Sequence, residues 1–153
     1  QQAIDTDPDE PMLAWAPDST CGVTRYCKAT NNSSGAPATI DWSGSTSVSA
    51  NTAALLVSGL PANQPGLFFY GPNEVSVPFG DGNRCVGGSL TRLNPAIFAD
   101  AAGDALRDLD FNTSPLASSG PGDTLRVQCW YRDPAAGAAG FNLSDALSIQ
   151  FCP

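Results

Sequence analysis

The chain of 153 residues is acidic, with 15 acidic and 7 basic side chains, no histidine and a formal net charge of −8. This charge argues against nucleic acid and anionic membranes as partners, and no apolar run is long enough to insert into a membrane. The lack of histidine excludes imidazole-dependent catalysis and histidine-ligated metal centres.

Residues 1–20 differ in composition from the rest of the chain. They contain five acidic residues and no basic residue, so they hold most of the net negative charge. We predict that residues 1–20 are an extended acidic N-terminal arm and that residues 21–153 form one domain. The start at Gln1-Gln2, without an initiator methionine, is typical of a mature end left by signal-peptide removal.

The arm has few large apolar side chains, and three of them are Met12, Leu13 and Trp15. Burying these three contributes roughly 5–8 kcal/mol, whereas ordering eight residues costs roughly 8–16 kcal/mol of backbone entropy. Because side-chain anchors alone fall short, the arm also needs the hydrogen bonds that an exposed sheet edge offers. We therefore predict that Met12, Leu13 and Trp15 form a self-assembly interface.

The length of the arm allows it to lie on a neighbouring copy. Twenty extended residues reach up to roughly 70 Å, and a globule of this size is roughly 40 Å across. A head-to-tail contact that does not close produces filaments. The alternative is that the arm folds back onto its own domain.

After the arm, the chain reads as short strands, because 15 Gly and 13 Pro interrupt any long helix. Residues 21–37 are expected to be an entry loop with a short first strand. The strand-like runs that follow are 38–44, 47–50, 52–60, 66–71, 74–79 and 85–93. Residues 96–111 are expected to form a hairpin that turns at Ala102–Asp104, with a short helix as the alternative.

Two further strands alternate clearly between apolar and polar residues. The run 123–133 places Leu125, Val127, Cys129 and Tyr131 on one face and polar residues with Trp130 on the other. The run 142–151 places Leu143, Leu147, Ile149 and Phe151 on one face together with Asp145. This pattern predicts a sheet with one solvent-facing side and an all-β fold, a single β-sandwich of jelly-roll or immunoglobulin-like type.

Three long motifs are spread over most of the domain's length: RYCKATNNSSG, GLFFYGPNEVSVPFGDGNRCVGG and CWYRDPAAGAAGFNLSDALSIQFCP. They resemble a largely uncharacterised family of secreted and surface β-domains from bacteria with complex envelopes. The resemblance implies an extracellular, all-β and non-enzymatic protein. It covers Tyr26 to Pro153, and neither the arm nor Cys21 lies within it.

The resemblance also implies disulfides between Cys85 and Cys129 and between Cys27 and Cys152, which leaves Cys21 over. Five cysteines in a lysine-poor chain favour an oxidising compartment. The residues alone leave other pairings open.

We expect no cofactor and no metal site. The run DTDPDE resembles the start of a calcium loop, but its twelfth position is Ala16, which offers no side-chain oxygen, so an acidic linker is favoured. The run FGDGNR at 79–84 is expected to be a type I′ or II turn. The carboxylates left for acid–base chemistry are Asp41, Glu74, Asp81, Asp133 and Asp145, and no pattern pairs two of them, so we predict that the protein is not an enzyme.

Three aromatic side chains are candidates for stacking on sugar rings: Trp42, Tyr70 and Trp130. The competing interpretation is that they pack into the core. We predict a secreted structural protein, the subunit of an extracellular filament or surface assembly, which is joined to copies of itself through its arm. The alternative is a non-catalytic polysaccharide-binding module of the cell surface.

Overall fold

The computed structural model describes residues 21–153. The predicted arm over residues 1–20 lies outside the described residues. The proposed interface residues Met12, Leu13 and Trp15 and the acidic run at 5–10 therefore stay predictions.

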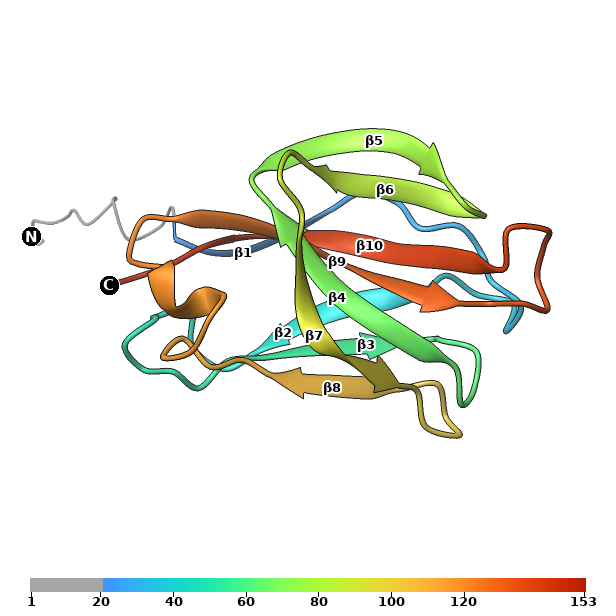
Figure 1. The fold of residues 1–153 in the computed structure, drawn as a ribbon, viewed down its shortest axis with the longest axis horizontal. Helices are drawn as coiled ribbons and strands as arrows, with labels where there is room; N and C mark the ends of the chain where they lie inside the picture. The colour runs from blue at the N-terminus through green and yellow to red at the C-terminus, as the bar shows by residue number, and fades with distance from the viewer. Residues whose placement is uncertain (1–20) are drawn as a thin grey trace, which may run out of the picture.

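The described residues form three antiparallel layers (Figure 1). A five-stranded sheet has the order β1-β10-β9-β4-β7, a three-stranded sheet has the order β2-β3-β8, and β5 pairs with β6 in a hairpin. The strands are β1 Gly22–Tyr26, β2 Thr39–Ser43, β3 Ala54–Ser58, β4 Pro65–Gly71, β5 Asn73–Phe79, β6 Gly82–Gly87, β7 Thr91–Phe98, β8 Ala105–Asp108, β9 Thr124–Arg132 and β10 Phe141–Gln150. The described part contains only a 3-10 turn at Leu116–Ser118 as helix and has no helix able to cross a membrane.

The main core lies between the five-stranded and three-stranded sheets. Ile40 and Val57 from the small sheet pack with Phe68, Val127 and Ile149 from the large one, and all five are buried. Alternate residues along each strand supply these side chains, as period-two patterning requires. The predicted single all-β sandwich is confirmed.

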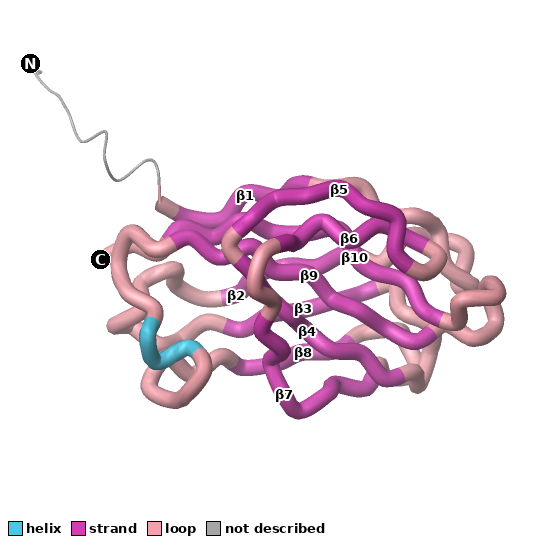
Figure 2. The backbone as a smooth tube through the Cα atoms, turned by 45° about the horizontal axis from the view of Figure 1, so that its top comes forward, coloured by secondary structure: helices cyan, strands magenta, loops and turns pink. Residues whose placement is uncertain are grey.

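A second core covers the outer face of the large sheet. The β5–β6 hairpin lies over β10 and β9 (Figure 2), and Phe69, Val86, Leu143 and Ala146 are buried beneath it. The prediction of a solvent-facing side on these two strands is therefore wrong. Even Gln128, on the face predicted to be polar, is 0% exposed, because the hairpin closes over it.

A β-bulge in β10 changes which of the two cores its side chains face. The pairing with β9 shifts register between Leu143 and Ala146. Leu143 therefore faces the hairpin, whereas Leu147 faces the main core, which corrects the prediction that they share a face. The backbone N–H of Cys129, opposite the bulge, donates to the hydroxyl of Ser144 at 3.0 Å.

Three strand predictions differ from the structure. Residues 48–50 are a turn rather than a strand, and the run 85–93 is divided between β6 and β7. The segment 96–111 does turn near Gly103, but β7 pairs with β4 and β8 pairs with β3. The segment is therefore neither a hairpin nor a helix. It connects two sheets, because β7 pairs with a strand of the large sheet and β8 with a strand of the small sheet.

The disulfides join Cys21 to Cys152 and Cys27 to Cys85, and Cys129 is a buried free thiol. The predicted pairs Cys85–Cys129 and Cys27–Cys152 are therefore wrong. Cys129 faces the main core and Cys85 lies in the core under the hairpin, so they lie in different layers.

Strand β1 explains the other pairing. Its first residue, Gly22, pairs with Gln150 near the end of the chain, and its last residue, Tyr26, donates a hydrogen bond to the carbonyl of Cys85 at 2.6 Å. Cys21 lies just before β1 and Cys27 just after it. Because the two ends of β1 are near different partners, Cys21 pairs with Cys152 and Cys27 pairs with Cys85. By chain entropy, each disulfide stabilises the fold by about 4–5 kcal/mol.

Candidate functional site

A groove of about 600 Å³ lies between the β5–β6 hairpin and the outer face of the large sheet. Its lining is mostly apolar and comes from six strands and the turn before β7, so the packing of the hairpin on the sheet creates it. We call it the aromatic groove, and it is lined by Leu67, Phe69, Val77, Pro78, Phe79, Arg84, Leu90, Arg92, Trp130 and Phe141.

The turn of the hairpin positions the aromatic end of this groove. Phe79 and Gly82 close a two-residue turn whose first position, Gly80, has φ +60°. A positive φ at that position alone is typical of a type II′ turn, rather than the type I′ or II turn expected. A β-carbon on Gly80 would lie 2.3 Å from the ring of Phe141, so only glycine allows this ring to pack against the turn.

Aromatic rings and guanidinium groups pack against one another at this end. The ring centroids of Phe79 and Phe141 are 5.0 Å apart, and those of Trp130 and Phe141 are 5.6 Å apart. The guanidinium of Arg132 lies 5.4 Å from the Trp130 ring and that of Arg84 lies 6.0 Å from the Phe79 ring. Both contacts are within the range of cation–π attraction.

The charge of the groove is opposite to that of the whole chain. Arg84 and Arg92 line it, Arg132 stacks beside it, and no carboxylate belongs to its lining. Two of its large apolar side chains are also open to solvent, because Phe79 is 44% and Leu90 43% exposed. A surface of this kind suits an apolar partner that carries negative charge.

The three aromatic residues predicted to form a sugar-binding platform do not come together. Trp130 lies in the aromatic groove. Trp42 packs against the main core, with its ring centroid 6.4 Å from that of Phe151, and Tyr70 packs against the same core. The main core lies on the other side of the large sheet, so a single ligand surface cannot include all three.

A second hollow, of about 630 Å³, includes exposed side chains of the three-stranded sheet. Leu56, Phe98 and Leu106 contribute apolar surface, and Phe98 is 68% exposed. We call it the acidic hollow, because Asp41, Asp100 and Asp104 line it without any basic residue. Its charge is thus the reverse of that in the aromatic groove.

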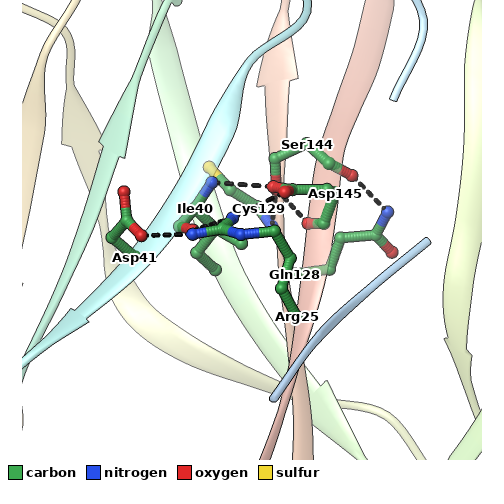
Figure 3. A network of polar contacts seen from close by, with 7 residues as sticks. All are labelled: Arg25, Ile40, Asp41, Gln128, Cys129, Ser144 and Asp145. Atoms are coloured by element: carbon green, nitrogen blue, oxygen red, sulfur yellow. Dashed lines mark hydrogen bonds and ion pairs between the residues drawn. The ribbon is translucent and has the colours of Figure 1, made fainter. Parts of the chain in front are cut away.

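Two of the candidate carboxylates, Asp41 and Asp145, form ion pairs with the same guanidinium (Figure 3). Arg25 donates to Asp145 at 2.6 Å and also to Asp41, and Asp145 accepts the backbone N–H of Ile40 at 2.8 Å. The hydrogen bond to Asp145 is the main reason why the pKa of Arg25 is raised. The shared guanidinium bridges the two carboxylates, so the arrangement joins β1, β2 and β10 through charged hydrogen bonds.

A second set of buried polar contacts fastens the hairpin to the sheet. The side-chain amide of Gln128 donates to the carbonyls of Asn83 and Ser144, and its oxygen accepts the N–H of Cys85 at 2.9 Å. These bonds satisfy a polar group that would be costly to bury alone. They hold the hairpin, and with it the groove, in place.

The remaining candidate carboxylates each contact different residues. Glu74 pairs with Arg126 at 3.6 Å. Asp133 is buried and accepts hydrogen bonds from the backbone and hydroxyl of Ser33. Asp81 lies in the hairpin turn and donates its backbone N–H to Phe141. Within residues 21–153, no three acidic or cysteine side chains gather as metal ligands would.

Among the groove residues, sequence reasoning assigned only Trp130 a role in stacking on a ligand. Phe79 belongs to the run FGDGNR, and Phe141 follows Gly140 in another of the motifs. Both residues therefore lie in segments noted from the sequence, but no binding role was predicted for either. Nothing in the sequence shows that two positions so far apart in the chain meet. Comparison with protein-family models, with curated proteins and with solved structures finds no match for the chain.

Proposed function

We propose that the protein is a secreted structural protein, the subunit of an extracellular filament or surface assembly, and that its N-terminal arm joins neighbouring copies. The observation that carries the proposal is the attachment of the arm. Cys21, the first described residue, is disulfide-bonded to Cys152, and Gly22 already pairs with Gln150. The chain before Cys21 therefore leaves from an end of the sandwich that a disulfide and strand pairing hold together.

The sandwich also offers unpaired strand edges that could receive an arm. Among the described strands, β1 and β7 end the large sheet, β2 and β8 end the small sheet, and β5 pairs only with β6. An extended segment that adds to such an edge gains the backbone hydrogen bonds that the arm requires.

The disulfides support a secreted location. Cys21–Cys152 and Cys27–Cys85 are of the kind that persist in oxidising compartments. The resemblance noted from the sequence motifs points to the same location.

One observation favours the alternative, a polysaccharide-binding module. Trp130 is partly exposed in a groove with three further aromatic rings. However, Arg84 and Arg92 are the only charged side chains in the lining, and no Asp, Asn, Gln, Ser or Thr is there. Neutral sugars are usually oriented by several such groups, so self-assembly is the better supported function.

Electron microscopy of the purified chain tests this proposal. The full chain is expected to form filaments or ordered assemblies, and a variant without residues 1–17 is expected to remain a folded monomer that keeps Cys21. Assemblies that persist without the arm would overturn the proposal. Binding to a glycan array by a chain that never assembles would favour the alternative.

A further inference from the structure

We propose that the aromatic groove is the acceptor for the arm, and that it binds the segment Met12–Trp15 of a second copy. This inference rests on the proposed function, because it names the site at which the arm of one subunit meets the next. The occupant is an extended acidic segment with large apolar side chains, and residues 1–20 have that chemistry.

The apolar side chains of the groove match those of the arm. Val77, Phe79 and Leu90 are exposed by 37%, 44% and 43% and contribute to the groove lining. Leu13 and Trp15 are two residues apart, so they point to one side of an extended segment. Seated in the groove, both would cover apolar surface that is now in contact with water.

The groove lies beside an open strand edge. Val77, Pro78 and Phe79 belong to β5, which pairs only with β6 among the described strands. The segment can therefore add to β5 as a further strand, while its side chains enter the groove. Pro78 has no N–H, so other residues of β5 must donate the hydrogen bonds.

Charge selects this site over the acidic hollow. Asp5, Asp7, Asp9 and Glu10 precede the apolar segment of the arm. Arg84 and Arg92 line the groove, and Arg132 stacks on Trp130 beside them. The acidic hollow has comparable size and exposed apolar side chains, but Asp100 and Asp104 line it in addition to Asp41, which pairs with Arg25, so its lining would repel an acidic arm.

Geometry favours the arm of another copy over the chain's own arm. Trp15 precedes Cys21 by six residues, so their α-carbons are at most about 22 Å apart. Cys21 lies beside Gln150 at one end of the ten-residue strand β10, and Phe141 begins its other end. At about 3.3 Å per residue these ends are roughly 30 Å apart, so the aromatic end of the groove at Phe141 lies beyond the backbone reach of Trp15 in the same chain.

The test uses single substitutions in the full chain and measures assembly by sedimentation velocity. Trp15→Ala removes the anchor of the arm, and Phe79→Ser or Leu90→Ser removes apolar lining of the groove. Each is expected to raise the apparent dissociation constant about 10- to 30-fold, as for an apolar hot spot. Arg92→Glu is expected to raise it about 3- to 10-fold, with a smaller effect at high salt.

Matched controls remove similar groups elsewhere. Phe98→Ser and Leu106→Ser replace exposed apolar side chains in the acidic hollow, and Lys28→Glu reverses an exposed charge outside the groove lining. All three are expected to assemble like the parent chain. Far-UV circular dichroism checks the fold of every variant, and if Phe79→Ser unfolds, Leu90→Ser and Arg92→Glu decide the result.

The outcomes separate the groove from the proposed function. If Trp15→Ala loses assembly while the groove variants assemble like the parent, the acceptor is elsewhere and the groove proposal is overturned. If the parent chain does not assemble, or if Trp15→Ala assembles like the parent, the proposed function is overturned, and the groove proposal that rests on it is overturned too. If the groove variants assemble normally but lose binding to alginate, an acidic polysaccharide, the groove is a polysaccharide site instead.

Discussion

The ring of Phe79, at the end of β5, lies edge-on against the ring of Phe141, at the start of β10, with centroids 5.0 Å apart. This contact joins the tip of the β5–β6 hairpin to the large sheet. The aromatic end of the groove therefore depends on the hairpin turn, whose Gly80 lies against Phe141.

Substitution of Gly80 tests this dependence. Gly80→Ala places a β-carbon against Phe141 and strains a backbone with φ +60°, so it should lower the free energy of unfolding by about 1–3 kcal/mol. Gly120→Ala is the control, because a β-carbon there meets nothing within 4 Å. Equal urea midpoints for the two variants would show that the turn does not constrain Phe141.

The shared guanidinium of Arg25 predicts unequal roles for its two carboxylates. Asp145→Asn should cost about 2–3 kcal/mol of stability, because it removes a charged partner from a mostly buried hydrogen bond. Asp41→Asn should cost less than about 1 kcal/mol, since the Asp41 side chain is 54% exposed. Urea unfolding of both variants makes the comparison, and a larger loss for Asp41→Asn would contradict it.

The free thiol predicts a simple labelling pattern. Cys129 is fully buried, and burial raises the pKa of its thiol to about 12, so iodoacetamide should not modify it in the folded protein. In denaturant without reductant, Cys129 alone should be alkylated. Peptide mapping should find Cys21 linked to Cys152 and Cys27 linked to Cys85, whereas a peptide that links Cys85 to Cys129 would refute this arrangement.

Three groups, of which Tyr131 and Cys129 are buried and Tyr26 is partly buried, predict that stability falls in alkali. Burial raises the pKa of Tyr26, Tyr131 and Cys129 to about 12, from ordinary values of 10.0 for the tyrosines and 9.0 for the thiol. The folded state keeps these protons to higher pH than the unfolded state does. Their stabilising contribution is therefore complete below about pH 9 and is lost as the pH rises toward about 12.

Urea unfolding at a series of alkaline pH values measures this loss. Tyr131→Phe cannot ionise at that position, so its stability should fall less steeply with pH than that of the parent chain. A parent whose stability stays constant from about pH 9 to about pH 11 would contradict the expected linkage.

The sequence allowed the fold class to be predicted, because period-two patterns in β9 and β10 are a local property of the chain. It did not reveal the covered outer face, since Gln128 and Ser144 are polar and their burial depends on bonds across three strands, β6, β9 and β10. The bulge in β10 likewise reversed the side to which Leu143 points. Such effects arise from pairing between distant strands.

The candidate site was still harder to predict. Phe79, Trp130 and Phe141 meet only because the hairpin folds over the large sheet. The cysteine pairs also depend on register, since β1 carries Cys21 and Cys27 at its two ends and the structure places those ends near different partners. The resemblance in motifs did not indicate how β1 pairs, so the disulfides that it implied were wrong.

A mixing experiment tests the central claim most directly. A Trp15→Ala chain retains its groove but lacks a working arm, and a Phe79→Ser, Leu90→Ser chain retains its arm but lacks a working groove. Each is expected to be monomeric alone by sedimentation velocity. Because one intact arm then meets one intact groove, the mixture should form a one-to-one complex that grows no further. A mixture that remains monomeric, while the parent chain assembles, would contradict the account.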